Sequence, residues 1–149
     1  MSKSSEEVVI ALRKVVADSY ALLGQTHLCH WNVRGPSFFS LHTAFEEQYT
    51  ELFTAIDEIA ERIRALGALA PGGLSSLAGM AGTAELKEDA SASEMVKHLC
   101  ALNLNLVSDL NAAREYAAEA GDNQTEDLMI GRLQVHEKTL WMLKSFLES

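Results

Sequence analysis

Residues 30–61 read HWNVRGPSFFSLHTAFEEQYTELFTAIDEIAE, and the second part of this stretch decides the fold of the chain. Apolar side chains follow Ser37 at alternating steps of four and three residues, which is the spacing of an amphipathic helix packed into a bundle. The positions concerned are Leu41, Phe45, Tyr49, Leu52, Ile56, Ile59, Ile63 and Leu66. The pattern predicts one long helix between about Ser37 and Leu66.

A second stripe of the same helix carries His42 and Glu46 and, further along, Asp57 and Glu61. At about 100° per residue these four side chains share one face. The helical rise nevertheless separates Glu46 from Asp57 by about 16 Å, which is too far for ligands of one metal centre. Two antiparallel copies related by a twofold axis near Glu51 and Leu52 would instead bring Glu46 of one chain opposite Asp57 of the other.

His30 ends the preceding helical segment, and the turn at Gly35 and Pro36 allows it to fold back towards His42. A His and an acid four residues apart are on their own usually a solvated pair, so it is the repetition on one stripe that favours a metal site. Imidazole together with carboxylate is a ligand set suited to iron. We predict a site built from His30, His42 and Glu46 of one subunit and Asp57 and Glu61 of the other.

These residues resemble the Dps family, the mini-ferritins named as DNA-binding proteins from starved cells. The resemblance rests on HWNVRGP at 30–36, on the His twelve positions after His30 with an acid four beyond it, and on DEIAERI at 57–63. Two positions depart from the family pattern: position 46 is Glu where many members carry Asp, and position 25 is Gln where many carry Lys. The resemblance implies an all-α, ferritin-like four-helix bundle with one long crossover that contains a short helix.

The resemblance also implies a function. Dps proteins form a hollow shell of twelve subunits, oxidise Fe(II) at ferroxidase sites that hold two irons between subunits, and store Fe(III) inside, which protects against oxidative damage. Hydrogen peroxide is the expected oxidant, with oxygen slower. Asp122 and Asp127 match acids that line pores at the threefold axes, although helix capping is an alternative role for Asp122. His27 is either a further ligand or a structural histidine. Trp31 is expected to pack in the core near the site, and the resemblance permits an added role as a local electron donor.

The first helix and the connection after the second are defined by caps and glycines. Ser4 followed by Glu7 predicts a capping box, and the helix is expected to continue to about Val33. Residues 67–90 contain five of the nine glycines, which predicts a long connection with a short helix around residues 74–79. A connection of this length can return the chain to the opposite end of the bundle.

Caps and a glycine also define the boundaries of the last two helices. Ser91 and Glu94 predict a capping box for the third, and Gly121 ends it. The fourth is expected to begin within residues 123–125. His136 falls in its apolar seam, where we expect a hydrogen-bonded core histidine rather than a ligand.

Composition limits the classes of partner. The 149 residues fit a single domain, 1–149, with 48% hydrophobic residues to form its core. The formal charge of −9 attracts cations and opposes binding to phosphate backbones, so we expect DNA binding to be weak or absent. A DNA-compacting protein with secondary iron binding is the alternative. Only Lys3 supplies a positive side chain ahead of the first helix, whereas DNA binding in the family is often attributed to a longer, lysine-rich tail.

Cysteine usage and hydropathy indicate the cellular setting. Cys29 and Cys100 form neither a metal-binding pair nor a dense disulfide framework, and we expect buried thiols in a reduced, cytoplasmic protein. The polar N-terminus does not resemble a signal peptide, and no run of eighteen apolar residues occurs in the sequence. The sequence therefore predicts no membrane association.

Overall fold

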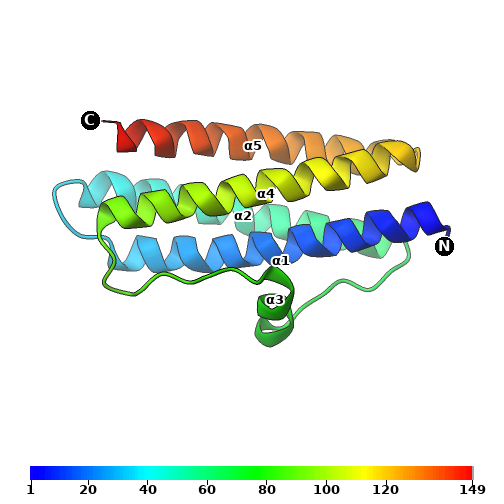
Figure 1. Cartoon of the computed structure of the whole chain (residues 1–149), viewed down its shortest axis with the longest axis horizontal. Helices are drawn as coiled ribbons and strands as arrows, with labels where there is room; N and C mark the ends of the chain where they lie inside the picture. The colour runs from blue at the N-terminus through cyan, green and yellow to red at the C-terminus, as the bar shows by residue number, and fades with distance from the viewer. Residues whose placement is uncertain (149) are drawn as a thin grey trace.

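The computed structural model describes residues 1–148, and this part of the chain contains helices and no strand. Four long helices lie side by side, and a short fifth helix projects from one flank of the bundle (Figure 1). In chain order they are α1 Lys3–Asn32, α2 Phe38–Ala65, α3 Leu74–Ala81, α4 Ala92–Glu119 and α5 Asn123–Leu147. The all-α fold, the boundaries of the second helix and the short helix in the connection are confirmed.

The segment between α2 and α4 gives the bundle its topology. α1 and α2 are antiparallel, as are α4 and α5, whereas α2 and α4 point in the same direction (Figure 1). The chain therefore has to return along the whole bundle between them, and residues 66–91 do this along the flank of α1. Gly82 ends α3 in the left-handed conformation with φ 61°, which favours glycine because it has no Cβ.

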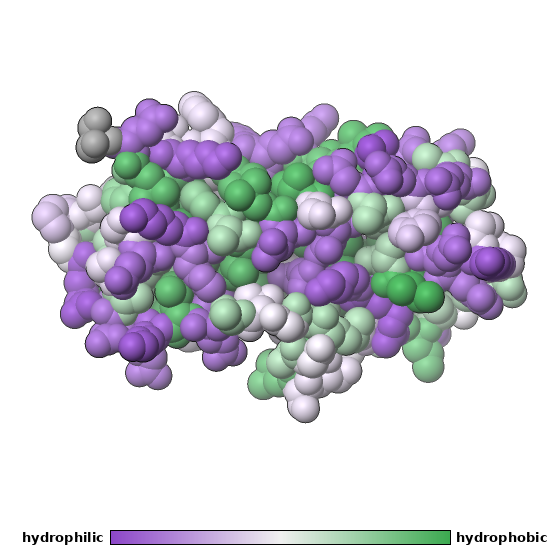
Figure 2. Space-filling view, in the orientation of Figure 1, coloured by the Kyte–Doolittle hydropathy of each residue, from purple (hydrophilic) through white to green (hydrophobic). Residues whose placement is uncertain are grey.

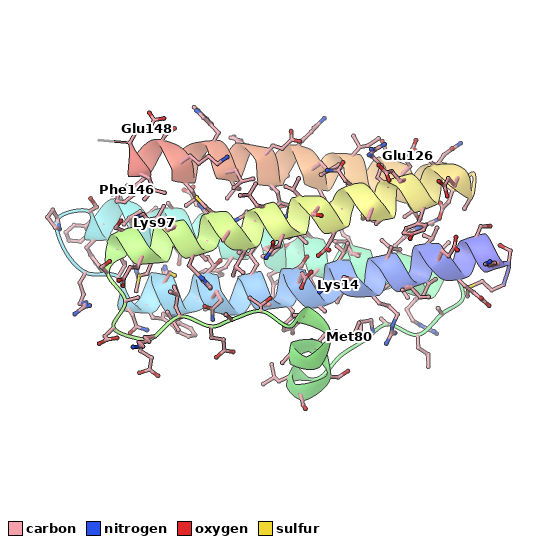
Figure 3. All side chains as sticks on the ribbon, in the orientation of Figure 1. Lys14, Met80, Lys97, Glu126, Phe146 and Glu148 are labelled. Atoms are coloured by element: carbon pink, nitrogen blue, oxygen red, sulfur yellow. The ribbon has the colours of Figure 1, made fainter. Side chains whose placement is uncertain are left out.

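Side chains of α1 hold this crossover by its main chain. Arg13 donates to the carbonyl oxygen of Leu69 at 2.7 Å, and the Lys14 ammonium donates to the carbonyl oxygens of Met80 and Ala81 at 3.1 and 3.2 Å. Figure 3 shows Lys14 on α1 close to the end of α3, where Met80 lies. Lys14 thereby caps the negative end of the α3 dipole.

Gln25 provides a further attachment of the same kind. Its side-chain oxygen accepts from the main-chain N–H of Leu86 at 2.8 Å, and the residue is 6% exposed. A lysine ammonium has three donors and no acceptor, so it could not receive this hydrogen bond. The departure from the family pattern at position 25 therefore has a structural explanation in how the crossover is attached.

The core follows the predicted seams. Leu12, Phe45 and Ile59 are fully buried at 0% exposure, as are Leu106 and Met129. Two predicted seam residues of α2 at the margins of the core are only partly buried, namely Tyr49 and Leu66. The apolar periodicity thus identified the buried face of α2.

The start of α1 differs from the prediction. Ser2, rather than Ser4, is the N-cap, and its hydroxyl oxygen accepts from the main-chain N–H of Ser5 at 3.2 Å. The capping box predicted for Ser4 and Glu7 is therefore wrong, because residues 3–5 are already helical. Several serines in one short stretch can cap, and the helix continues back to the first of them.

The capping box of the third long helix is confirmed. The Ser91 hydroxyl accepts from the N–H of Glu94 at 3.1 Å, and the Glu94 carboxylate accepts from the N–H of Ser91 at 2.9 Å. Both cysteines are free and buried, as expected. Burial raises the pKa of the Cys29 thiol to about 12, so this thiol is unreactive.

Several large apolar side chains lie on the surface of the single chain. The most exposed are Phe39 at 83%, Leu74 at 81%, Leu69 at 74%, Phe53 at 69%, Ile10 and Trp31 at 67% and Trp141 at 65%. In Figure 2 the projecting α3 carries mainly apolar and weakly polar surface, whereas much of the remaining face is hydrophilic. None of the helices within residues 1–148 has the length and apolar character that crossing a membrane requires.

Candidate metal centre

His30 and His42 face each other where α1 ends and α2 begins. His30 lies in the last turn of α1, and His42 lies in the second turn of α2. Their rings are stacked, with centroids 3.7 Å apart and planes 13° from parallel. The structure therefore brings together the two histidines that the sequence assigned to one site.

Each ring is oriented by the main chain of the other histidine. The Nδ1 atom of His30 lies 2.7 Å from the carbonyl oxygen of His42, and Nδ1 of His42 lies 2.7 Å from the carbonyl oxygen of His30. A carbonyl oxygen only accepts hydrogen bonds, so each Nδ1 must carry the proton. In the neutral rings Nε2 then keeps its lone pair, which is the arrangement found in metal-binding histidines.

Aromatic side chains pack around this pair. Phe38 stacks on His42 with centroids 5.0 Å apart, and Tyr49 meets His30 edge-on at 5.2 Å. Tyr49 also lies 4.3 Å from His27. From the sequence, Tyr49 was expected only in the apolar seam, and its position beside the site was not predicted. Its spacing of seven residues from His42, which puts both on one helix face, was the available signal.

His27 and Trp31 stack on each other, with centroids 4.9 Å apart and planes at 7°. Burial, and secondarily the charge of His30, lower the pKa of His27 and favour its neutral form. Trp31 is 67% exposed, so the prediction that it packs in the core is wrong for the single chain. The indole projects from the side of α1 opposite Cys29 and Val33, which are the residues that face the core.

The three predicted carboxylates lie on the exposed face of α2. Glu46 follows His42 by one turn, whereas Asp57 and Glu61 lie about three and four turns beyond Glu46. Phe53, which is 69% exposed, lies between the two groups on the same face. Within residues 1–148, no three His, Cys, Asp or Glu side chains come close enough together to hold a metal ion. One chain thus joins the two histidines and leaves the more distant acids apart from them.

Comparison with known proteins places this arrangement in a family. A family model for the ferritin-like domain matches residues 10–149. The DNA protection during starvation protein of Brevibacillus brevis is 40% identical over 144 residues, which cover 95% of each chain. The chain is a member of the Dps family.

Solved Dps structures closely match this Dps chain. The crystal structure of a Dps protein from Bacillus brevis has a TM-score of 0.95 at 37% identity and covers 99% of both chains. Dps from Vibrio cholerae, described as a member of a broad superfamily of ferritin-like diiron-carboxylate proteins, has a TM-score of 0.93 at 32% identity. That match covers 97% of this chain and 91% of the other. The expected family and the ferritin-like fold are confirmed.

The Dps chain holds another histidine inside the bundle. Arg132 donates to Nε2 of His136 at 2.8 Å, and Nδ1 of His136 donates to the side-chain oxygen of Asn103 at 2.9 Å. Arg132 also pairs with Glu51 of α2. Since arginine only donates, His136 is neutral, and burial together with the Arg132 charge lowers its pKa to about 3. The prediction of a hydrogen-bonded core histidine is confirmed.

The acids at the α4–α5 junction of the Dps chain differ in their surroundings. Asp122 is the N-cap of α5 and accepts from the N–H and the hydroxyl of Thr125 at 3.0 and 2.6 Å, while Arg62 donates to it at 2.9 Å. Burial tends to raise the pKa of Asp122, but the hydrogen bonds from Thr125 and the Arg62 charge together lower it. Asp127 is exposed. The pore role of both acids remains a prediction, and Asp122 is already paired within its own chain.

Proposed function

We propose that this Dps chain oxidises Fe(II) at sites shared between two subunits and stores the Fe(III) product inside a cytoplasmic shell of twelve subunits, thereby protecting against oxidative damage. Hydrogen peroxide is the proposed oxidant, with oxygen slower, and each site takes two irons as substrate. The proposed donors are His30, His42 and Glu46 of one subunit and Asp57 and Glu61 of the other.

The observation that carries this proposal is the oriented but incomplete donor set. Two imidazoles are fixed with their Nε2 lone pairs free for a metal, yet Asp57 and Glu61 of the same chain are several turns away. A second copy of α2, running antiparallel, would supply the missing carboxylates. The family relationship favours iron for a set of imidazole and carboxylate donors.

Phe53 supports the antiparallel arrangement. Its exposed ring lies between Glu46 and Asp57 on the face that would meet the partner, and covering it there removes apolar surface from water. Leu52, at nearly the same level, is only 3% exposed because it packs in its own core. At the proposed axis, Phe53 rather than Leu52 is therefore the apolar side chain offered to the partner.

The donor set suits the chemistry in three ways. Carboxylates neutralise and bridge the two irons, whereas the neutral imidazoles bind without adding charge. Each of two Fe(II) ions gives one electron to a single peroxide, whose O–O bond breaks, and two protons convert the oxygens to two waters. Because both electrons come from the iron pair, no hydroxyl radical is released.

Subunit mixing tests the shared site. His30→Ala/His42→Ala and Asp57→Ala/Glu61→Ala chains should each oxidise Fe(II) poorly on their own. After unfolding and co-assembly in equal amounts, about half of the dimers are mixed, and each mixed dimer holds one site with every ligand and one site without these four. Roughly a quarter of the wild-type, peroxide-driven initial rate should return.

A site built within one chain would recover nothing, because no chain in the mixture carries the full set. Native mass spectrometry shows whether mixed dimers formed. Confirmed mixed dimers without recovered oxidation would reject the shared site.

DNA association is the competing function suggested by the family name. The formal charge of −9 per chain leads us to propose that binding is weak or absent near neutral pH. A retarded DNA band at physiological salt, without divalent cations to bridge the charges, would contradict this.

A further inference from the structure

Arg62 links the end of α2 to the start of α5. Its Nε donates to the hydroxyl of Thr125 and its Nη2 to the carboxylate of Asp122, both at 2.9 Å. Thr125 is fully buried, and Asp122 is held in place as the N-cap of α5. Both acceptors are therefore fixed by α5 itself, and the guanidinium connects them to α2.

The position of Arg62 on α2 gives this link its significance. Arg62 directly follows Glu61 and lies five residues after Asp57. Neighbouring residues of a helix point about 100° apart, so Arg62 reaches α5 while Glu61 remains on the exposed face. The planar guanidinium donates in two fixed directions, which restrains both the rotation of this helix end and its position along α5.

The other ion pair between α2 and α5 cannot replace this one. Glu51, which pairs with Arg132 of α5, lies about three helical turns before Arg62 on α2. That pair restrains the middle of the helix, near the level of the proposed twofold axis. Among residues 1–148, Arg62 forms the ion pair to α5 that is nearest to the turns carrying Asp57 and Glu61.

We propose that Arg62 is a positioning residue, which fixes the two carboxylates that this chain contributes to the site completed by its partner. The inference rests on the shared site proposed above. Arg62 touches neither substrate nor the histidines of its own chain. It acts through α2, as the outer partners of metal ligands do when they set ligand orientation.

Subunit mixing also allows this role to be assigned to one chain. In the mixed dimer, the His30→Ala/His42→Ala chain donates only acids to the complete site, and the Asp57→Ala/Glu61→Ala chain donates only the remaining ligands. Arg62→Met is added to one chain or to the other. On the acid-donating chain it should lower the recovered Fe(II) oxidation roughly tenfold, and on the histidine-donating chain it should leave the recovered rate unchanged.

Two variants separate positioning from charge and from folding. Arg64→Met removes the same charge from the same end of α2, but Arg64 is exposed and donates to the carbonyl oxygen of Ala68, so either placement should leave the rate unchanged. Thr125→Val keeps the Arg62 charge and removes one of its two acceptors. On the acid-donating chain it should lower the recovered oxidation about two- to fivefold, roughly as expected for one lost outer hydrogen bond, and on the histidine-donating chain it should have no effect.

The outcomes are distinct. Equal loss from both placements of Arg62→Met, or no loss from either, rejects the positioning role. An asymmetry that Thr125→Val fails to reproduce rejects it as well, because the effect would then come from charge alone. Failure of the reference mixture, without any change at Arg62, to recover oxidation is instead a failure of the shared site.

Discussion

Two histidine clusters of this chain differ in how many ring nitrogens have a hydrogen-bond partner. At His136, each ring nitrogen has a partner from its own chain, and the amide of Asn103 donates onward to the carbonyl oxygen of Leu99 at 2.8 Å. At His30 and His42, only the Nδ1 atoms have hydrogen-bond partners in the described part of the chain, and these bonds fix the orientation of the rings. The first cluster is complete within the fold, whereas the second is prepared for something that the fold does not contain.

The difference shows how a structural histidine is distinguished from a ligand. Burial alone does not do so, because His30 and His136 are 6% and 4% exposed. What differs is the fate of the second ring nitrogen. The donor arginine at His136 occupies the lone pair that a metal would need, whereas residues 1–148 place no such donor at the Nε2 atoms of His30 and His42.

Breaking the complete cluster should have the largest effect on stability. His136→Leu should lower the free energy of unfolding by about 3 kcal/mol, because it leaves the buried Arg132 and Asn103 groups without a partner. His98→Leu on α4 is the matched control and should cost less than about 1 kcal/mol, since Nε2 of His98 has no partner among residues 1–148. Urea unfolding at pH 7 gives both values, and similar midpoints for the two variants would contradict the prediction.

Removing a histidine of the His30 and His42 pair should lower the rate of Fe(II) oxidation rather than the stability. His42→Ala should lower the initial rate of Fe(II) oxidation by about a hundredfold. Changes at outer partners of metal ligands cost up to about this much, and His42 is a proposed ligand itself. The same change should leave the urea midpoint close to wild type. Stopped-flow absorbance after peroxide addition measures the rate, and a rate within threefold of wild type would remove His42 from the site.

The pH dependence of stability tests the comparison further, because the pKa shifts of Asp109 and His136 change the stability in opposite directions as the pH rises. Burial, and then the hydrogen bond and charge of Asp18, raise the pKa of Asp109 to about 7, while Lys14 acts in the opposite direction. Stability from Asp109 is therefore present at low pH and falls as pH rises towards 7. Stability from His136, whose pKa is lowered, falls as pH drops below about 6.5.

Between about pH 4 and 6.5 the two slopes, each at most about 1.4 kcal/mol per pH unit, should largely cancel. Asp109→Asn should then make stability rise with pH over this range, and His136→Leu should make it fall. Urea midpoints measured at half-unit intervals test both signs. Parallel profiles for the two variants would show that one of the two pKa shifts is absent.

The smallest expected effect concerns the junction acids. Asp127→Asn should slow iron uptake roughly twofold at low ionic strength and low iron, and the effect should fade with added salt, since one exposed carboxylate per subunit acts through local cation concentration. Asp122→Asn keeps a capping side chain but loses the ion pair with Arg62, so it should lower stability, and any slowing that it causes through Arg62 should not fade with added salt. If both changes slow iron uptake equally and with the same salt dependence, Asp122 attracts cations at the pore even though it pairs with Arg62.

Much of the fold was predictable because it depends on local patterns. The apolar spacing after Ser37, the turn at Gly35 and Pro36, and the capping box at Ser91 each determine structure within a few residues. The start of α1 was misplaced because several serines compete as caps. The pairing of His30 with His42 was also predictable, because the turn between them is short.

Side-chain partners across the bundle were not predictable in the same way. The contacts of Arg62 with α5 and of Gln25 with Leu86 join residues about 60 positions apart, and no local pattern encodes them. The exposure of Trp31 was missed for a related reason. An aromatic residue beside a site is equally compatible with the core and with a surface that awaits a partner.

The attachment of the crossover has a consequence for how the sequence can diverge. Arg13, Lys14 and Gln25 each bind a carbonyl oxygen or an N–H of the crossover rather than a side chain. Any residue except proline presents the same N–H at position 86, and every residue presents the same carbonyl at positions 69 and 80. Substitutions at positions 69 and 80, and any at 86 other than proline, therefore leave these hydrogen bonds available, whereas their side-chain partners are fixed at three positions of α1.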